Sequence, residues 1–305
     1  MSQQHSSDVN AAEHANYYVP AQSKWPIIAT FGLLITVFGV GTWFNDLKAN
    51  HEQSHGPLIF FIGALFLAYM LFGWFGNVIK ESRGGLYSAQ MDRSFRWGMS
   101  WFIFSEVMFF AAFFGVLFYV RTWAGPWLGG EGDKGVAHML WPSFEYSWPL
   151  LNSPDPKLYP APKGVISPWG LPLLNTILLV SSSFTLTFAH HALRKNQRKP
   201  LTLWLALTVI LGIAFLGFQV EEYIHAYQEL GLTLGSGIYG ATFFMLTGFH
   251  GAHVTLGALM LSIMLIRIIR GHFSPEQHFG FEAAAWYWHF VDVVWIGLFV
   301  FVYVL

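Results

Sequence analysis

The sequence predicts an all-α membrane protein with seven transmembrane helices. Three observations predict this class: seven long apolar stretches, a low content of charged residues, and an excess of Lys and Arg on alternate connecting segments. Only 11% of the 305 residues are charged, and 54% are hydrophobic. Soluble domains carry about 25% charged residues, so a chain of this composition would not stay soluble as a globule.

Each apolar stretch reaches the roughly 20 residues that a helix needs to cross a bilayer. Several begin at or beside a proline, which the first turn of a helix accepts. The sixth is long for one crossing, which predicts a tilt or an extension beyond the bilayer. We expect one membrane domain over residues 25–305. Its predicted spans are Trp25–Phe44, Pro57–Ile79, Trp97–Val120, Leu171–Leu193, Leu201–Tyr223, Ile238–Ile266 and Ala283–Leu305.

The positive charges predict the orientation of these spans. Eleven of the 16 Lys and Arg residues fall on the side that holds residues 1–24, 80–96, 194–200 and 267–282. The other side holds the remaining five, which are Lys48, Arg121, Lys134, Lys157 and Lys163. Positive residues accumulate in cytoplasmic loops. We therefore expect a cytoplasmic N-terminus and a C-terminus on the opposite, outer face.

Composition excludes several classes of function. The near balance of 16 basic and 17 acidic residues argues against nucleic acid as a partner. The absence of cysteine excludes disulfides, Cys-ligated iron–sulfur clusters, thiol catalysis and Cys-based haem attachment. Residues 1–24 lack the features of a secretory signal and contain no Arg, so we expect a solvated polar tail on the cytoplasmic side.

One large extramembrane segment follows the third span, at about residues 121–170. It is rich in Trp, Pro and Gly. Such a composition fits either an ordered cap on the outer face that contacts a partner, or simply a long loop. The residues alone do not decide between the two.

Five ionisable residues lie deep in the predicted spans. At about 1.5 Å per residue, Glu106 lies roughly 15 Å from the cytoplasmic end of its span, and Asp292 lies about as deep. His289 precedes Asp292 by three residues and shares its helix face, and His250 and His253 form a second pair with that spacing. Residues of this kind are costly in a membrane and are usually functional or paired. Water should reach a further set near the span ends, which comprises His190, His191, Glu221, Glu222 and Glu282.

The residues leave three roles open for the deep set. The first is a metal or haem site, because imidazole and carboxylate are suitable ligands. The second is a proton relay in a transporter, because a buried carboxyl group can store an exchangeable proton. The third is structural hydrogen bonding between helices, which the small residues of GFHGAHVTLG (248–257) favour by allowing close approach. A haem between two histidines would need matched His pairs on separate helices, and the deep set lacks them.

Five blocks in the chain resemble subunit III of haem–copper cytochrome c oxidase, in the order that the family has them. They are NVIKES (77–82), FRWGMSWFIFSEVMFF (95–110), PLLNTILLVSSSFTLTFAHHAL (172–193), YGATFFMLTGFHGAHV (239–254) and FGFEAAAWYWHFVDVVW (279–295). The resemblance runs from about residue 24 to the C-terminus. It implies a seven-helix bundle in which a lipid-filled V-shaped cleft separates spans one and two from spans three to seven.

The resemblance also implies a non-catalytic core subunit of a proton-pumping terminal oxidase. In this family haem and copper belong to subunits I and II, so no cofactor other than bound phospholipid is expected here, and no metal or catalytic residue. The subunit packs on subunit I, holds phospholipids in the cleft and supports proton uptake, while the complex passes electrons from cytochrome c to oxygen. The first two spans favour a cytochrome c oxidase over a quinol oxidase. The Cys-free chain without a transit signal favours a bacterial inner membrane, with a periplasmic C-terminus, over the mitochondrial inner membrane, although a mitochondrially encoded chain would also lack a presequence.

At single positions, the resemblance implies three kinds of role. Glu106 matches the carbodiimide-reactive membrane glutamate of the family, and His253 matches a histidine of the same bundle whose role stays open. The expected lipid-binding residues are Arg96, Arg267, Trp74, Lys80 and Glu81.

Two other hypotheses remain: an independent proton-coupled transporter that uses Glu106, His253 and Asp292 as a relay, and an integral haem protein.

Overall fold

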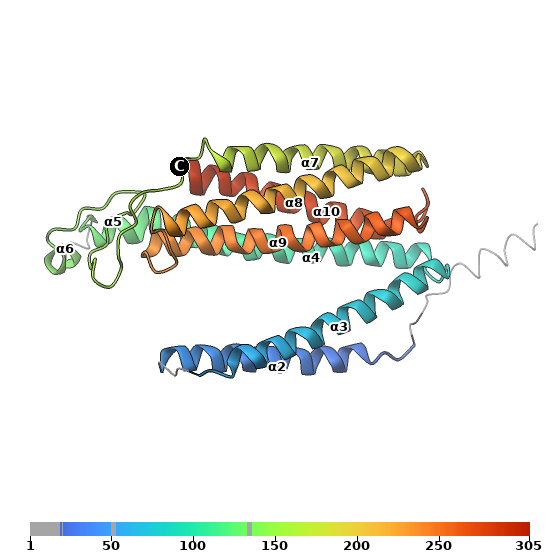
Figure 1. The fold of residues 1–305 in the computed structure, drawn as a ribbon, viewed down its shortest axis with the longest axis horizontal. Helices are drawn as coiled ribbons and strands as arrows, with labels where there is room; N and C mark the ends of the chain where they lie inside the picture. The colour runs from blue at the N-terminus through green and yellow to red at the C-terminus, as the bar shows by residue number, and fades with distance from the viewer. Residues whose placement is uncertain (1–18, 20, 50–52, 133–135) are drawn as a thin grey trace, which may run out of the picture. The chain divides into compact units, whose positions relative to one another are not determined.

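All seven predicted spans are helical in the structure, which is a computed structural model that describes residues 19, 21–49, 53–132 and 136–305. These residues form helices, turns and loops without a strand, so the predicted all-α membrane class is confirmed (Figure 1). Residues 1–18 and 20 of the predicted tail, residues 1–24, lie outside the described part. The spans are α2 (Trp25–Lys48), α3 (Gly56–Arg83), α4 (Ala89–Tyr119), α7 (Leu171–Arg194), α8 (Arg198–Gln228), α9 (Ile238–Ile269) and α10 (Phe279–Leu298).

Most helices extend further than their apolar runs. α4 begins at Ala89 instead of the predicted Trp97, and α8 continues to Gln228 instead of Tyr223. Hydropathy marks only the part of a helix that suits lipid, whereas the backbone hydrogen bonds continue until a local signal ends them. At the end of α7 that signal is Asn196, in the left-handed conformation with φ 55°, and at the end of α9 it is Gly271 with φ 72°.

The chain divides into two compact units, Met1–Phe95 and Arg96–Leu305. In the first unit α2 and α3 pack through glycines that recur every seven residues, Gly32 and Gly39 on α2 and Gly56 and Gly63 on α3. A Cβ atom on Gly39 would overlap the backbone nitrogen of Phe60. Small residues allow this close approach in a membrane, where packing replaces the hydrophobic effect.

In the second unit two tryptophans of α10 lie at the centre of the core. Trp288 and Trp295 are fully buried. Their indole N–H groups donate to α7, Trp288 to Ser182 at 2.9 Å and Trp295 to Thr176 at 3.0 Å. A buried indole needs such an acceptor, so each tryptophan both fills space and fixes the rotation of α10 against α7.

The segment after α4 is ordered where the structure describes it. It contains a π-helical turn at Val120–Ala124 and two short helices, α5 (Gly125–Leu128) and α6 (Val136–Leu140). The Tyr146 hydroxyl donates to the carbonyl of Arg121 at 2.6 Å, and burial raises the pKa of Tyr146. Trp148 packs edge-on against Tyr239 of α9. This favours the ordered cap over the plain loop, and its contact with a partner stays a prediction.

The glycine seam of the first unit gives a test with an internal control. We expect Gly39→Ala to destabilise the α2–α3 pair by about 1–3 kcal/mol, because the added methyl group overlaps the Phe60 backbone. Gly41→Ala is the matched control, since a Cβ atom there meets nothing within 4 Å. Thermal unfolding of the purified protein in detergent measures both. Equal stability of the two variants would contradict the close packing.

Candidate functional site

Glu106 of α4 pairs with His253 of α9. Glu106 Oε2 lies 2.8 Å from His253 Nε2, and the two side chains are 21% and 13% exposed in this chain. The other ring nitrogen, Nδ1, lies 2.7 Å from the carbonyl oxygen of Phe249. A carbonyl oxygen only accepts hydrogen bonds, so Nδ1 carries a hydrogen. A single further proton then lies between Glu106 and Nε2, as a neutral acid beside a neutral imidazole or as an ion pair.

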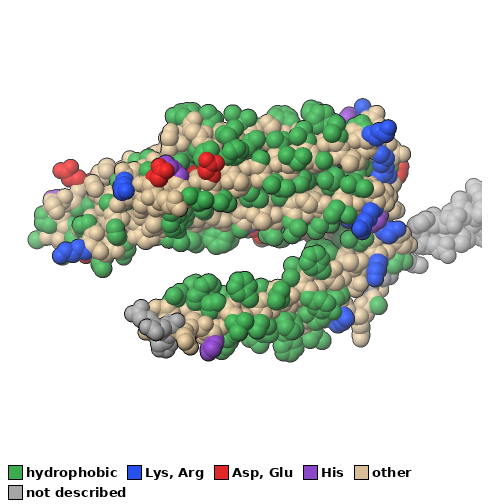
Figure 2. Space-filling view, in the orientation of Figure 1, with side chains coloured by type: hydrophobic (Ala, Val, Ile, Leu, Met, Phe, Trp, Pro, Cys, Tyr) green, Lys and Arg blue, Asp and Glu red, His purple; other side chains and the backbone are tan. Residues whose placement is uncertain are grey.

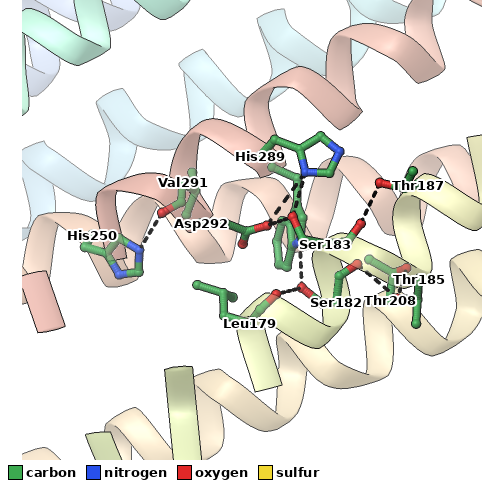
Figure 3. A network of polar contacts seen from close by, with 11 residues as sticks. Leu179, Ser182, Ser183, Thr185, Thr187, Thr208, His250, His289, Val291 and Asp292 are labelled. Atoms are coloured by element: carbon green, nitrogen blue, oxygen red, sulfur yellow. Dashed lines mark hydrogen bonds and ion pairs between the residues drawn. The ribbon is translucent and has the colours of Figure 1, made fainter. Parts of the chain in front are cut away.

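Asp292 of α10 belongs to a separate network, which Ser183 of α7 holds together (Figure 3). The Ser183 hydroxyl contacts Asp292 Oδ2 by a short hydrogen bond and lies 2.6 Å from His289 Nδ1. A hydroxyl group has one hydrogen to donate. If Asp292 accepts it, His289 Nδ1–H donates to the Ser183 oxygen. His289 and Asp292 therefore meet through Ser183, because their own closest approach is 3.9 Å.

His250 stands apart from both groups. Its side chain is fully buried, and Nε2 donates to the carbonyl of Val291 at 3.2 Å (Figure 3). The ring packs against Trp295 and Phe215, with centroids 5.0 and 5.7 Å away. Within the described chain, Nδ1 has no hydrogen-bond partner. The set His250, His253, His289 and Asp292 thus does not form one hydrogen-bonded cluster.

The histidines of this set do not suit a haem held between two imidazoles. His253 and His250 already engage their Nε2 atoms, with Glu106 and with the Val291 carbonyl. A haem held between two imidazoles would need one unengaged ring nitrogen from each of two histidines to face the same space. Among the described residues, no hydrogen bond joins the Glu106–His253 pair to the Ser183 network, so the structure holds no direct protein relay between the two carboxyl groups.

The two arginines expected to bind lipid have protein contacts in the second unit. Arg96 forms an ion pair with Glu282 and lies over the ring of Phe279, 5.2 Å from its centroid. Arg267 is 9% exposed and stacks on Phe273 at 4.2 Å. A guanidinium group has five N–H donors, so these contacts leave the predicted contact with a phosphate group untested.

The other three expected lipid residues lie on α3 of the first unit. Trp74 is 47% exposed and stacks on Phe75, with ring centroids 5.2 Å apart. Lys80 is exposed, whereas Glu81 accepts a hydrogen bond from the Tyr87 hydroxyl at 2.8 Å. Their role in binding lipid stays a prediction.

One expectation about the span ends is wrong. Its position at the end of a span predicts that Glu222 reaches water, whereas the side chain is fully buried. α8 continues past it, and the π-helical C-terminal turn Phe299–Val304 places the Tyr303 hydroxyl 2.6 Å from Glu222 Oε1. Glu221 is exposed, as expected. Counting along a span gives the depth of both residues and cannot tell which one a neighbouring segment covers.

A group of side chains that the sequence did not predict lies at the other end of this unit from Glu222. His190 at the end of α7 and His278 just before α10 converge on Glu282, which also holds Arg96. The spacing of His278 and Glu282 by four residues was a signal for their pairing, since such residues are neighbours on a helix. No sequence signal linked them to His190, which lies 88 residues earlier than His278.

Comparison with known proteins gives the family. Residues 14–153 and 140–305 match the sequence model of the family described as cytochrome c oxidase subunit III. The chain belongs to the cytochrome c oxidase subunit III family. It is 38% identical over 292 residues to cytochrome c oxidase subunit 3 of Prototheca wickerhamii, an alignment that covers 94% of this chain and 96% of the relative.

Other members of the subunit III family are similarly related. The proteins of Drosophila melanogaster and Arabidopsis thaliana, both named cytochrome c oxidase subunit 3, are each 38% identical over 295 residues, with 97% of each relative covered. These matches confirm the predicted family and do not support an independent transporter. Respiration and electron transport follow from the family, as does membership of an oxidoreductase complex.

The Ser183 network gives the first prediction about the site. We expect Ser183→Ala to lower the free energy of unfolding by about 1–3 kcal/mol, because it removes the hydroxyl group bonded to a buried carboxyl group. Ser181→Ala is the control, since Ser181 forms no side-chain hydrogen bond with the described residues. Thermal melting in detergent measures both, and a Ser183 variant as stable as the Ser181 variant would show that the network is not stabilising.

The Glu106–His253 pair gives the second prediction about the site. We expect Glu106→Gln to leave the complex assembled and oxygen reduction active, since the Gln amide can donate to His253 Nε2 where the acid stood. Oxygen consumption by the purified complex, with subunit content checked on a gel, measures this. A fully assembled Glu106→Gln complex without activity would assign the carboxyl group an essential role in turnover.

Proposed function

We propose that the chain is the supporting subunit of a proton-pumping terminal oxidase that passes electrons from cytochrome c to oxygen. It carries no redox centre of its own. Its partners are subunits I and II, which bear the haem and copper. The observation that supports this most strongly is the family match, which extends from residue 14 to the last residue of the chain.

The polar interior of the second unit supports a structural rather than a conducting role. Each deep carboxyl group meets a side chain of another helix: Glu106 of α4 meets His253 of α9, and Asp292 of α10 meets Ser183 of α7. In lipid such bonds are the main polar force that specifies helix pairing. The chain would then support proton uptake by packing against the neighbouring subunits. Glu106 would contribute to the stability of its own helix pair.

The proposed location is a bacterial inner membrane, with the N-terminus cytoplasmic and the C-terminus periplasmic. In the second unit, Lys and Arg side chains gather where α7 ends and α8 begins, which is the end predicted to face the cytoplasm (Figure 2). The basic residues of this α7–α8 connection are Arg194, Lys195, Arg198 and Lys199. The single membrane domain over residues 25–305 and its lipid-filled cleft remain part of the proposal.

Purification in mild detergent tests the proposed assembly. We expect an affinity-tagged chain to bring down subunits that bear haem and copper, and the chain to show no Soret absorption after those subunits are dissociated. A chain that purifies alone and moves protons in liposomes would contradict the proposal. A Soret band that stays with the isolated chain would instead favour an integral haem protein.

The lipid role has its own test. We expect Arg96→Gln combined with Arg267→Gln to lower the phospholipid phosphorus retained per purified complex, because guanidinium groups bind phosphate through charged hydrogen bonds. Arg93→Gln with Arg270→Gln is the matched control, since it removes two exposed arginines near the same helix ends. Equal phosphorus in the two double variants would count against a lipid site at Arg96 and Arg267.

A further inference from the structure

We propose that His190, His278 and Glu282 form a binding site for a divalent transition-metal ion of the Zn²⁺ type. The three residues come from the end of α7, the residue before α10 and the first turn of α10. One ligand atom from each, His190 Nε2, His278 Nε2 and Glu282 Oε1, points into a common space. The site is separate from the proposed supporting role and needs none of it.

The separations of the three atoms match the edges of a tetrahedron around zinc. The two Nε2 atoms lie 3.4 Å apart, and Glu282 Oε1 lies 3.5 Å from His190 Nε2 and 3.2 Å from His278 Nε2. Zinc–ligand bonds of 2.0–2.2 Å at tetrahedral angles require edges of about 3.3–3.5 Å. Two imidazoles and a carboxylate are also a ligand set that Zn²⁺ accepts.

The surroundings orient two of the ligands. His278 Nδ1 lies 3.2 Å from the carbonyl oxygen of Ser274, which can only accept, so Nδ1 carries the hydrogen and Nε2 presents its lone pair to the site. A histidine that ligates a metal characteristically donates its other N–H to such an oxygen. Arg96 holds Glu282 by the other carboxylate oxygen, Oε2, which leaves Oε1 directed at the histidines.

Burial divides the site into a closed and an open side. The side chains of His278 and Glu282 are 10% and 14% exposed, and that of His190 is 30% exposed. An ion could therefore enter past His190 and keep a water molecule as its fourth ligand. Bound there, it would join the end of α7 to the start of α10, and through Glu282 and Arg96 to α4.

Zinc binding to the purified protein tests the site. The chain is purified in mild detergent with whatever subunits accompany it, treated with EDTA and dialysed against Zn²⁺, and bound zinc is counted per chain. We expect His190→Gln and His278→Ala each to bind one zinc ion fewer than the wild type. His191→Ala and His225→Ala are controls, since His191 is the exposed neighbour and His225 pairs with Glu229 without a second histidine.

Two readouts make the result decisive. Zinc K-edge absorption should lose part of its imidazole scattering in the two site variants and keep it in the controls, and Zn²⁺ should raise the melting temperature of the wild type but not of His190→Gln. Equal zinc counts and equal zinc-induced shifts in wild type and site variants would overturn the proposal. If His278→Ala does not accumulate, His190→Gln decides alone, because the partly exposed position tolerates a polar side chain.

Discussion

Hydrogen bonds between helices in the absence of water are the constraint on which the second unit depends. A polar group in hydrocarbon must find its partner within the protein, so each one specifies which helices meet and at what rotation. α10 shows this most fully, because Trp288, Trp295 and Asp292 all reach hydroxyl groups of α7. The first unit has a different solution, in which glycines bring α2 and α3 into direct backbone contact.

Interhelical hydrogen bonds also hold the deep ionisable residues in place. Glu106 and Asp292 lie in apolar surroundings, and each is bonded to a side chain that belongs to a different helix. A residue held in this way contributes to assembly whether or not it exchanges a proton. The family places the redox chemistry in a complex of several subunits, and this chain contributes an interior in which polar groups tie helices together.

Composition and the excess of Lys and Arg on alternate connecting segments were sufficient to predict the fold class and the seven spans, because the bilayer imposes both patterns. They could not predict the partners. Depth counting placed Glu106, Asp292 and the histidines at similar levels, but a level does not give the rotation of a helix. His250 and His253 lie about 60° apart around α9, which is enough to direct one at α10 and the other at α4. Likewise, nothing in the run Ser181, Ser182, Ser183 marks the last as the residue that binds Asp292.

We expect the Glu106–His253 bond to stabilise the bundle and not to be needed for turnover. A double-mutant cycle of Glu106→Leu and His253→Leu, measured by thermal unfolding of the purified complex, isolates the coupling between the two side chains. We expect a coupling of about 0.6–1.7 kcal/mol, from the average to the largest value for interhelical hydrogen bonds in membranes, with oxygen consumption retained in the double variant. Additive stability effects together with lost oxygen consumption in an assembled complex would contradict a purely stabilising role of the Glu106–His253 bond.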